Sequence, residues 1–187
     1  MSQVAAAGRP PPVRILGIDP GSHKLGWGVV EVSQGRLRQV AAGTLQAPAG
    51  DLRERLLYLC DQLAAAVVAH APSMAAVERI FHAKNSHSAL TLGHARGAVL
   101  VCIGRAGLAV HEYTAGQIKQ AVTGRGRADK QQVQAMVRLL LGLSPQLPLG
   151  LDTSDALAAA VCHAQIACHP GAARWAAAAA GAGGRRA

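Results

Sequence analysis

Aromatic and acidic residues are both scarce in this 187-residue chain. Phe, Trp and Tyr together make up 3% of the sequence, so Ala, Leu and Val must fill most of the core. No apolar run approaches the ~20 residues that a membrane-spanning helix requires. The N-terminus lacks a basic segment leading into an apolar stretch, which is the pattern of a secretory signal. We therefore expect a cytoplasmic protein with no membrane partner.

The chain also lacks closely paired cysteines. Its four cysteines lie in apolar, helix-like segments, and none belongs to a C-x-x-C pair. This pattern indicates buried thiols in a reducing compartment. A zinc cluster built from Cys162-His163 and Cys168-His169 is the alternative, but the spacing matches no common zinc pattern.

Positive charge, in contrast, is abundant. Lys and Arg number 19 against 10 Asp and Glu, which gives a net charge of +9. Such an excess favours polyanionic partners, because basic side chains contact phosphates and release their counterions. A generally basic, alanine-rich composition is the alternative explanation; it accounts for the C-terminal tail but not for the placement of the internal basic residues.

The composition divides the chain into one domain and two tails. Residues 1–12 end in a proline-rich run and are expected to form a disordered arm. Residues 13–169 are long enough for a single folded domain. Residues 170–187 are rich in Ala and Gly and are expected to be a disordered tail.

Hydrophobic periodicity predicts an α/β domain with a mixed five-stranded sheet and helices on both faces. The first three strands should form an antiparallel meander, whereas each of the last two follows a helix and should pair in parallel by a right-handed crossover. The first strand then lies centrally. The predicted strands are 13–19, 25–33, 36–46, 74–79 and 108–113, and the predicted helices are 51–70, 86–105, 114–121, 128–141 and 153–168.

Four acidic residues lie at ends of predicted elements and are the candidate catalytic and metal-binding residues. Alternation places Asp19 on the same face of the first strand as Ile15 and Gly17, among core-type neighbours. Carboxylates held close together need cations to remain ionised, and hard divalent ions such as Mg²⁺ prefer oxygen ligands. The set is Asp19, Glu78, Asp152 and Asp155.

Each acid also has a simpler interpretation. For Asp19 it is a hydrogen bond to its own turn, and for Glu78 it is a solvated side chain or a pair with Arg79. Asp152 and Asp155 have the spacing of an N-cap and an N3 residue, which would stabilise the last helix by ~1 kcal/mol. The two interpretations of this pair are compatible, since residues three apart on a helix face the same side.

Basic residues form two groups along the chain whose side chains can reach phosphates. For each group, a solvated face of the protein is the alternative interpretation. Phe81, the only Phe, is either a ring that stacks on a base or a core residue. Gly93 and Gly97 are spaced for close helix approach, in a dimer or within the fold. The first basic group is Lys84, His87, His94 and Arg96, and the second is Lys119, Arg125, Arg127 and Lys130.

Taken together and in this order, six sequence blocks resemble the RuvC family of bacterial Holliday junction resolvases. The resemblance covers about residues 13–168 and leaves out the N-terminal arm and the C-terminal tail. The blocks are 17–21 (GIDPG), 77–85 (VERIFHAKN), 88–97 (SALTLGHARG), 117–124 (QIKQAVTG), 130–134 (KQQVQ) and 152–158 (DTSDALA).

This resemblance implies a ribonuclease H-like fold and a homodimer that acts on four-way junction DNA in recombination and repair. It implies Mg²⁺-dependent nicking of two strands of like polarity, with 5′-phosphate and 3′-hydroxyl products. One or two ions would bind per subunit, and Mn²⁺ should substitute. It also implies partnership with the RuvA–RuvB branch-migration complex.

Residue by residue, the family's acidic quartet matches the four acids named above; some members carry His at the position of Asp152. The family's wedging aromatic residue matches Phe81, and basic residues tied to DNA or catalysis match Lys119 and Lys130. We expect Lys84, Arg96, Arg125 and Arg127 to contact DNA as well.

Three alternatives remain open at this stage. The GIDPG opening also resembles the first phosphate loop of actin-like ATPases, which however need two such domains and a longer chain. A ribonuclease H-like nuclease acting on another nucleic acid, such as an RNA–DNA hybrid, is the second. The third is a junction-binding protein that does not cleave.

Overall fold

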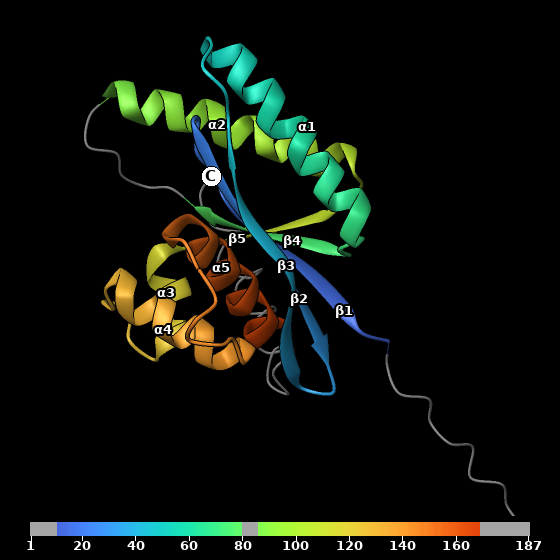
Figure 1. Ribbon diagram of the computed structural model, residues 1–187, viewed down its shortest axis with the longest axis vertical. Helices are drawn as coiled ribbons and strands as arrows, with labels where there is room; N and C mark the ends of the chain where they lie inside the picture. The colour runs from blue at the N-terminus through green and yellow to red at the C-terminus, as the bar shows by residue number, and fades with distance from the viewer. Residues whose placement is uncertain (1–10, 80–85, 169–187) are drawn as a thin grey trace, which may run out of the picture.

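The protein is built on one five-stranded sheet with helices packed on both faces (Figure 1). The computed structural model describes residues 11–79 and 86–168. The predictions for the N-terminal arm and C-terminal tail therefore fall almost entirely outside the described residues, and those for Phe81 and Lys84 fall outside them as well. None of the helices in the described part of the chain combines the length and apolar character that a membrane crossing requires.

All the predicted strands and helices are present in the predicted order, with ends that differ by a few residues. The elements are β1 (Val13–Asp19), β2 (Lys24–Ser33), β3 (Arg36–Gln46), α1 (Leu52–His70), β4 (Met74–Arg79), α2 (Ser86–Arg105), β5 (Ala109–Thr114), α3 (Ala115–Thr123), α4 (Lys130–Leu141) and α5 (Leu151–Cys168).

The strand order is β3-β2-β1-β4-β5, which confirms the predicted mixed sheet with β1 at its centre. The pairs β1·β2 and β2·β3 are antiparallel, whereas β1·β4 and β4·β5 are parallel. Parallel strands end at the same edge of a sheet. The last residues of β1, β4 and β5 therefore meet at one edge.

Local capping explains where several helices begin. The Asp51 carboxylate accepts the Glu54 N–H at 2.8 Å, and the Glu54 carboxylate accepts the Asp51 N–H at 3.1 Å, as the sequence predicts for a capping box. Asp129 accepts the Gln132 N–H at 2.8 Å in the same way. Because Asp129 is the cap, α4 begins at Lys130, and the predicted start at residue 128 is two residues too early.

Alternate residues of the central strand face two separate cores. Ile15 packs with α3, α4 and α5 on one face, whereas Leu16 and Ile18 pack with α1 and α2 on the other. This arrangement confirms that Ile15, Gly17 and Asp19 share a face, because side chains alternate along a strand. Cys102 and Cys162 are buried thiols, and Cys60 is a half-buried one.

The N-terminal half of α5 lies directly on the backbone of β1 and β2. A Cβ atom at Gly17 would lie 1.9 Å from the Ala156 carbonyl oxygen, and one at Gly26 would lie 2.0 Å from the Asp152 carbonyl oxygen. Any side chain at these two positions would push α5 away from the sheet. The glycines therefore determine how close the start of α5 comes to the end of β1.

Gly17→Ala tests this close contact. We expect it to lower the free energy of unfolding by about 3 kcal/mol or more, because the neighbouring atoms are backbone and cannot turn aside. Gly116→Ala is the matched control, since the nearest atom to its new Cβ would lie at an ordinary 3.9 Å. Urea unfolding of both variants provides the measurement. Equal stability of the two variants would contradict the proposed contact.

Candidate active site

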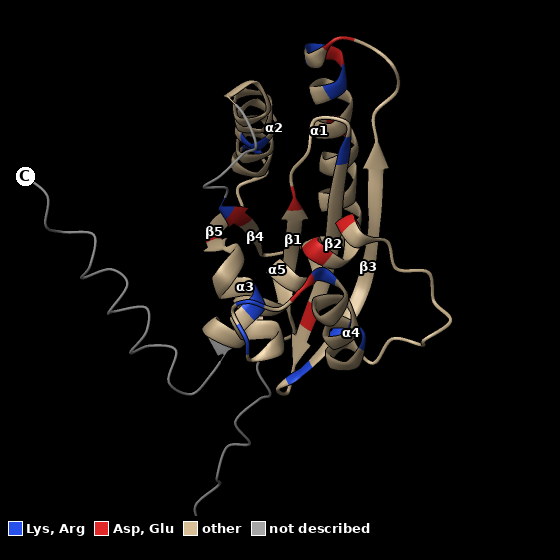
Figure 2. Ribbon diagram, turned by 90° about the vertical axis from the view of Figure 1, so that its left-hand side faces the viewer, with Lys and Arg blue, Asp and Glu red and all other residues tan. Residues whose placement is uncertain are grey.

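The four candidate acids come from three elements that meet at one edge of the sheet. Asp19 is the last residue of β1, and Glu78 is the penultimate residue of the parallel strand β4. Asp152 and Asp155 belong to the start of α5, whose backbone touches Gly26, the register partner of Asp19. Figure 2 shows acidic segments of β1 and α5 in red, with basic segments of α3 and α4 in blue beside them.

The start of α5 corrects one prediction. The Ser154 N–H donates to the Gly150 carbonyl at 2.9 Å, so the helix begins at Leu151 and not at residue 153. The prediction that Asp152 is the N-cap, with Asp155 at N3, is therefore wrong. Both carboxylates lie inside the helix, one turn apart on the same side. They are free of a capping role.

Burial and nearby negative charges perturb two of these carboxyl groups, Asp19 and Glu78. Burial, followed by the negative charges of Asp155 and Glu78, raises the pKa of Asp19 from 3.8 to about 7; Asp152 adds a smaller increase. Burial and the charge of Asp155 also raise the pKa of Glu78. A carboxylate that raises the pKa of another lies within electrostatic reach of it. The structure thus places the other three predicted acids within electrostatic reach of Asp19.

Two predicted lysines contribute positive charge at the same place. The Lys130 ammonium donates to a carboxylate oxygen of Asp155 at 2.6 Å, and this hydrogen bond raises the pKa of Lys130. The charge of Lys130 lowers the pKa values of both Asp19 and Glu78, and that of Lys119 lowers the pKa of Glu78. Lys130 therefore partly neutralises the acidic cluster.

The donor set fits a hard divalent cation. Four carboxylates supply only oxygen ligands, which Mg²⁺ prefers, and a divalent cation would relieve the repulsion that raises the pKa of Asp19. Among the described residues, no three His, Cys, Asp or Glu side chains already stand in a metal-holding arrangement. In this structure the Asp155 carboxylate is hydrogen-bonded to the Lys130 ammonium and does not stand beside two further carboxylates as a metal ligand would.

The other predicted DNA contacts are dispersed. Arg125 and Arg127 are exposed in the segment between α3 and α4, where Thr123 Oγ1 accepts the Arg125 N–H at 3.1 Å. Arg96 instead forms an ion pair with Glu112 of β5. His87 and His94, from the same predicted basic group as Arg96, are exposed on α2.

Sequence reasoning missed two contributors near this edge. The hydroxyl groups of Thr44 and Thr153 hydrogen-bond at 2.9 Å and tie β3 to the start of α5, which no local pattern signals. Glu112 was not singled out either. A usable signal exists for it, because a carboxylate inside a short strand is unusual in a chain with only 10 acidic residues.

The sheet order β3-β2-β1-β4-β5, with helices on both faces, defines the class of protein as one with a ribonuclease H-like α/β fold. The family model described as "Crossover junction endodeoxyribonuclease RuvC" matches residues 15–163. The chain therefore belongs to the RuvC family, and the predicted resemblance is confirmed.

Relatives and solved structures agree with this assignment. The chain is 50% identical to the crossover junction endodeoxyribonuclease RuvC of Chloroflexus aurantiacus over 156 residues, which cover 83% of this chain and 94% of that protein. Thermus thermophilus RuvC matches with a TM-score of 0.75 at 35% identity, covering 83% of this chain and 95% of that one. A yeast mitochondrial Holliday junction resolvase, Ydc2, shares the fold, with a TM-score of 0.59 at 12% identity over 83% of this chain and 79% of that one.

Asp19→Asn tests the electrostatic strain of the cluster. Because folding raises the pKa of Asp19 to about 7, the folded state holds this proton more tightly than the unfolded state, and its stability falls as pH rises from about 4 towards 7. We expect Asp19→Asn to stabilise the metal-free protein by roughly 1–3 kcal/mol at pH 8, and by less at pH 5. Urea unfolding in EDTA at both pH values measures the difference.

Asp61, which is exposed on α1, supplies the control for this prediction. Asp61→Asn should change stability little at either pH. A stabilisation by Asp19→Asn that is the same at pH 5 and pH 8 would show that charge repulsion at Asp19 is not its cause.

Proposed function

We propose that the protein resolves Holliday junctions by nicking two strands of like polarity symmetrically, as a homodimer that uses Mg²⁺. Membership of the RuvC family supports the activity, and Thermus thermophilus RuvC, 36% identical with a TM-score of 0.75 over 81% of this chain, has been solved in complex with Holliday junction substrate. The observation that carries the proposal is the placement of Asp19 at the end of β1, Glu78 near the end of the neighbouring parallel strand β4, and Asp152 and Asp155 at the start of α5, which packs on β1. The raised pKa of Asp19, caused by burial and then by the nearby acids, supports it.

The acidic cluster determines where the reaction takes place. Asp19, Glu78, Asp152 and Asp155 would hold Mg²⁺, or Mn²⁺ in its place, at the carboxyl edge of the sheet. When bound, such an ion lowers the pKa of water and stabilises the leaving oxygen of a phosphodiester. The four carboxylates would hold that ion at this edge of the sheet, and hydrolysis would leave 5′-phosphate and 3′-hydroxyl ends.

The lysines act on the phosphate. Lys130 pairs with Asp155 in the absence of substrate, and its side chain is 62% exposed, so its ammonium is accessible to a phosphate oxygen. Lys119 lies within electrostatic reach of Glu78. Positive charge held at this position stabilises the charge that develops on the phosphate in the transition state.

The basic side chains around this edge would hold the DNA backbone. Arg125 and Arg127 are exposed on the α3–α4 segment, and contacts from such residues to phosphates provide position and affinity. Phe81 and Lys84 stay predicted DNA contacts outside the described residues. A DNA contact by Arg96 also stays a prediction, and its ion pair with Glu112 favours a structural role.

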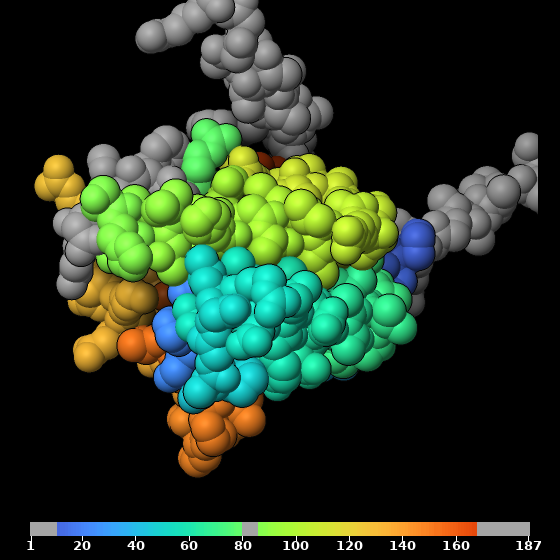
Figure 3. Space-filling model, turned by 90° about the horizontal axis from the view of Figure 1, so that it is seen from above, coloured from blue at the N-terminus to red at the C-terminus, as the bar shows by residue number. Residues whose placement is uncertain are grey.

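An outward stripe on α2 supports the homodimer. A Cβ atom added at Gly93, Gly97 or Gly104 would meet nothing within 4 Å, so these residues face away from the fold. Leu90 and Val101 share this side of the helix and are 61% and 56% exposed. In Figure 3, α2 lies at the surface beside α1.

An exposed row of glycines and apolar side chains suits close, self-complementary contact between two copies of a helix. A two-fold dimer would present two acidic clusters to two strands of like polarity. The interaction with RuvA–RuvB stays a prediction that follows from the family.

Val101→Asp tests the dimer. We expect it to weaken self-association by about 100-fold or more, because a two-fold contact would bury two carboxylates without partners. Sedimentation equilibrium across a range of protein concentrations measures this. Val68→Asp is the matched control, since Val68 is 83% exposed on α1. Dimers that survive Val101→Asp would place the interface elsewhere.

Asp19→Asn and Asp155→Asn test the catalytic proposal. Each should slow cleavage of a synthetic four-way junction in Mg²⁺ by roughly 100-fold or more, because the cation loses a ligand. Junction binding measured with Ca²⁺ should change little, since the basic surface is intact. The assay is gel analysis of end-labelled junctions under single-turnover conditions.

A linear duplex and an RNA–DNA hybrid distinguish the alternatives in the same assay, and Asp61→Asn is the control variant. Wild-type protein that binds the junction but does not nick it with Mg²⁺ or Mn²⁺ would identify a non-catalytic binding protein. Faster cleavage of the hybrid than of the junction would identify a different nuclease.

A further inference from the structure

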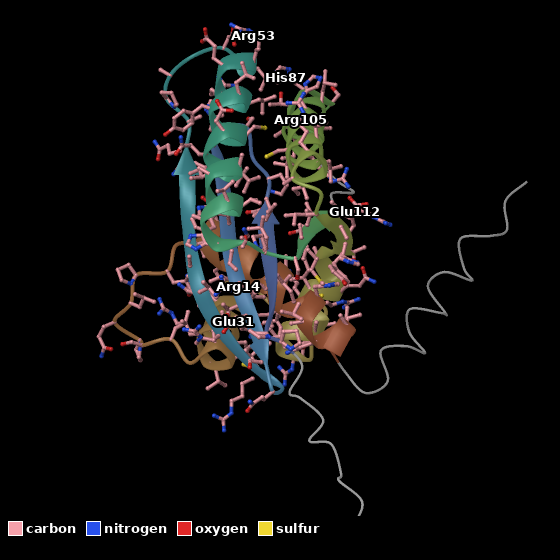
Figure 4. All side chains as sticks on the ribbon, turned by 90° about the vertical axis from the view of Figure 1, so that its right-hand side faces the viewer. Arg14, Glu31, Arg53, His87, Arg105 and Glu112 are labelled. Carbon is pink, nitrogen blue, oxygen red and sulfur yellow. The ribbon has the colours of Figure 1, made fainter. Side chains whose placement is uncertain are left out.

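Glu112 contacts two arginines that come from different elements. Its carboxylate forms an ion pair with Arg96 of α2 and lies 3.8 Å from the guanidinium of Arg79, the last residue of β4. The Glu112 and Arg96 side chains are 27% and 25% exposed, so both charges are largely withdrawn from water. Figure 4 shows Glu112 beside α2, away from the labelled pair Arg14 and Glu31.

The register of the sheet explains why these groups meet. Glu112 of β5 lies opposite Val77 of β4, and Val77 faces the core formed with α1 and α2. Arg79 is two residues further along β4, so its side chain is on that same face. Arg96 reaches the carboxylate from α2, which packs over β5.

Glu78 lies between Val77 and Arg79 and therefore points to the opposite face, towards α5. Its Cα atom is about 3.8 Å from that of Arg79, across a single planar peptide. A shift of the Arg79 backbone therefore moves Glu78 as well. Glu112 contacts the Arg79 guanidinium, so it is one of the groups that bear on the position of Glu78 relative to Asp155, whose charge, after burial, raises the pKa of Glu78.

We propose that Glu112 is a positioning residue for Glu78: by holding Arg79 and Arg96 together, it fixes the carboxyl end of β4 beneath the acidic cluster. This inference rests on the proposed junction-cleaving function. Glu112 touches neither the acidic cluster nor the exposed arginines of the α3–α4 segment in the described part of the chain. Its ion pair keeps Arg96 against β5, so we expect its removal to change the rate of cleavage and the use of the cation more than DNA affinity.

The chain contains a matched control for this idea. Glu31 of β2 also bridges two arginines, since its carboxylate oxygens lie 3.1 Å from both Arg14 and Arg38. Arg14 pairs in register near the start of β1, at the opposite end of that strand from Asp19. Glu31→Gln therefore removes the same kind of interaction from the same sheet without moving the end of β4.

The experiment compares Glu112→Gln with Glu31→Gln and the wild type. We expect Glu112→Gln to lower the single-turnover cleavage rate at saturating junction by roughly 10- to 100-fold, the range found when groups that orient a metal ligand are removed. The Mg²⁺ concentration for half-maximal rate should rise. The junction dissociation constant, measured with Ca²⁺, should stay within about 2-fold, and Glu31→Gln should cleave at the wild-type rate.

Three further variants separate positioning from a general loss of stability. Arg96→Gln and the double variant Arg96→Gln/Glu112→Gln complete a double-mutant cycle, in which the rate loss of the double variant should be no greater than that of Glu112→Gln alone. Glu112→Asp keeps the charge on a shorter side chain and should recover part of the rate. It is also the variant to measure if Glu112→Gln does not fold.

The results that would overturn the inference are distinct from failure of the proposed function. If the wild type cleaves and Glu112→Gln cleaves at the same rate, the positioning role is rejected but the proposed function is not. The same conclusion follows if Glu112→Gln and Glu31→Gln lose the same share of the wild-type rate. Loss of junction affinity that accounts for the whole rate loss would assign the pair to DNA binding instead. Absence of wild-type cleavage would reject the proposed function.

Discussion

The direct contact between the α5 backbone and the backbone of β1 and β2 is the constraint on which the site depends. Gly17 and Gly26 leave no room for even one carbon atom between the sheet and the helix. This contact brings two carboxylates of α5 to the edge where β1 and β4 place Asp19 and Glu78. Without it, the two carboxylates of α5 would lie apart from Asp19 and Glu78, which the neighbouring strands β1 and β4 bring to the same edge.

That close approach has an electrostatic cost, which the chain offsets in part. Burial and the neighbouring carboxylates raise the pKa of Asp19 to about 7, and the Lys130 ammonium supplies compensating charge through Asp155. A bound cation would remove the repulsion between the carboxylates. The free energy released in this way would add to the affinity of the site for the cation. The same repulsion that lowers the stability of the metal-free protein therefore favours binding of a metal cation.

Neighbouring residues at the carboxyl end of β4 point to opposite faces of the sheet. Glu78 points to the α5 face and contributes to the acidic cluster, whereas Arg79 points to the α2 face and meets Glu112. Since neighbouring residues of a strand point in opposite directions, the proposed chemistry lies on one face and the proposed anchor of the strand on the other. The outward stripe of α2 is the proposed surface for a second protomer, so one helix borders both the anchor and the dimer contact that we propose.

Local patterns in the sequence were sufficient for the element order, the mixed sheet and the face on which Asp19 lies, and the caps at Asp51 and Thr114 are likewise contacts between residues three positions apart. These features depend on periodicity and on hydrogen bonds between residues a few positions apart, which a single segment specifies. The start of α5 was misjudged because Gly150 supplies the first helical carbonyl, and a glycine carries no side-chain signal for that role.

Only the folded chain decided which distant groups meet. The coupling of Asp19 with Asp155, the pairing of Lys130 with Asp155 and the capture of Arg96 by Glu112 all join residues from different elements. Such contacts depend on the distance and angle at which helices pack on the sheet, and those follow from the combined shape of many side chains. The sequence does not show whether a basic residue on a helix faces DNA or a buried carboxylate. Only its neighbours in the folded chain distinguish the two.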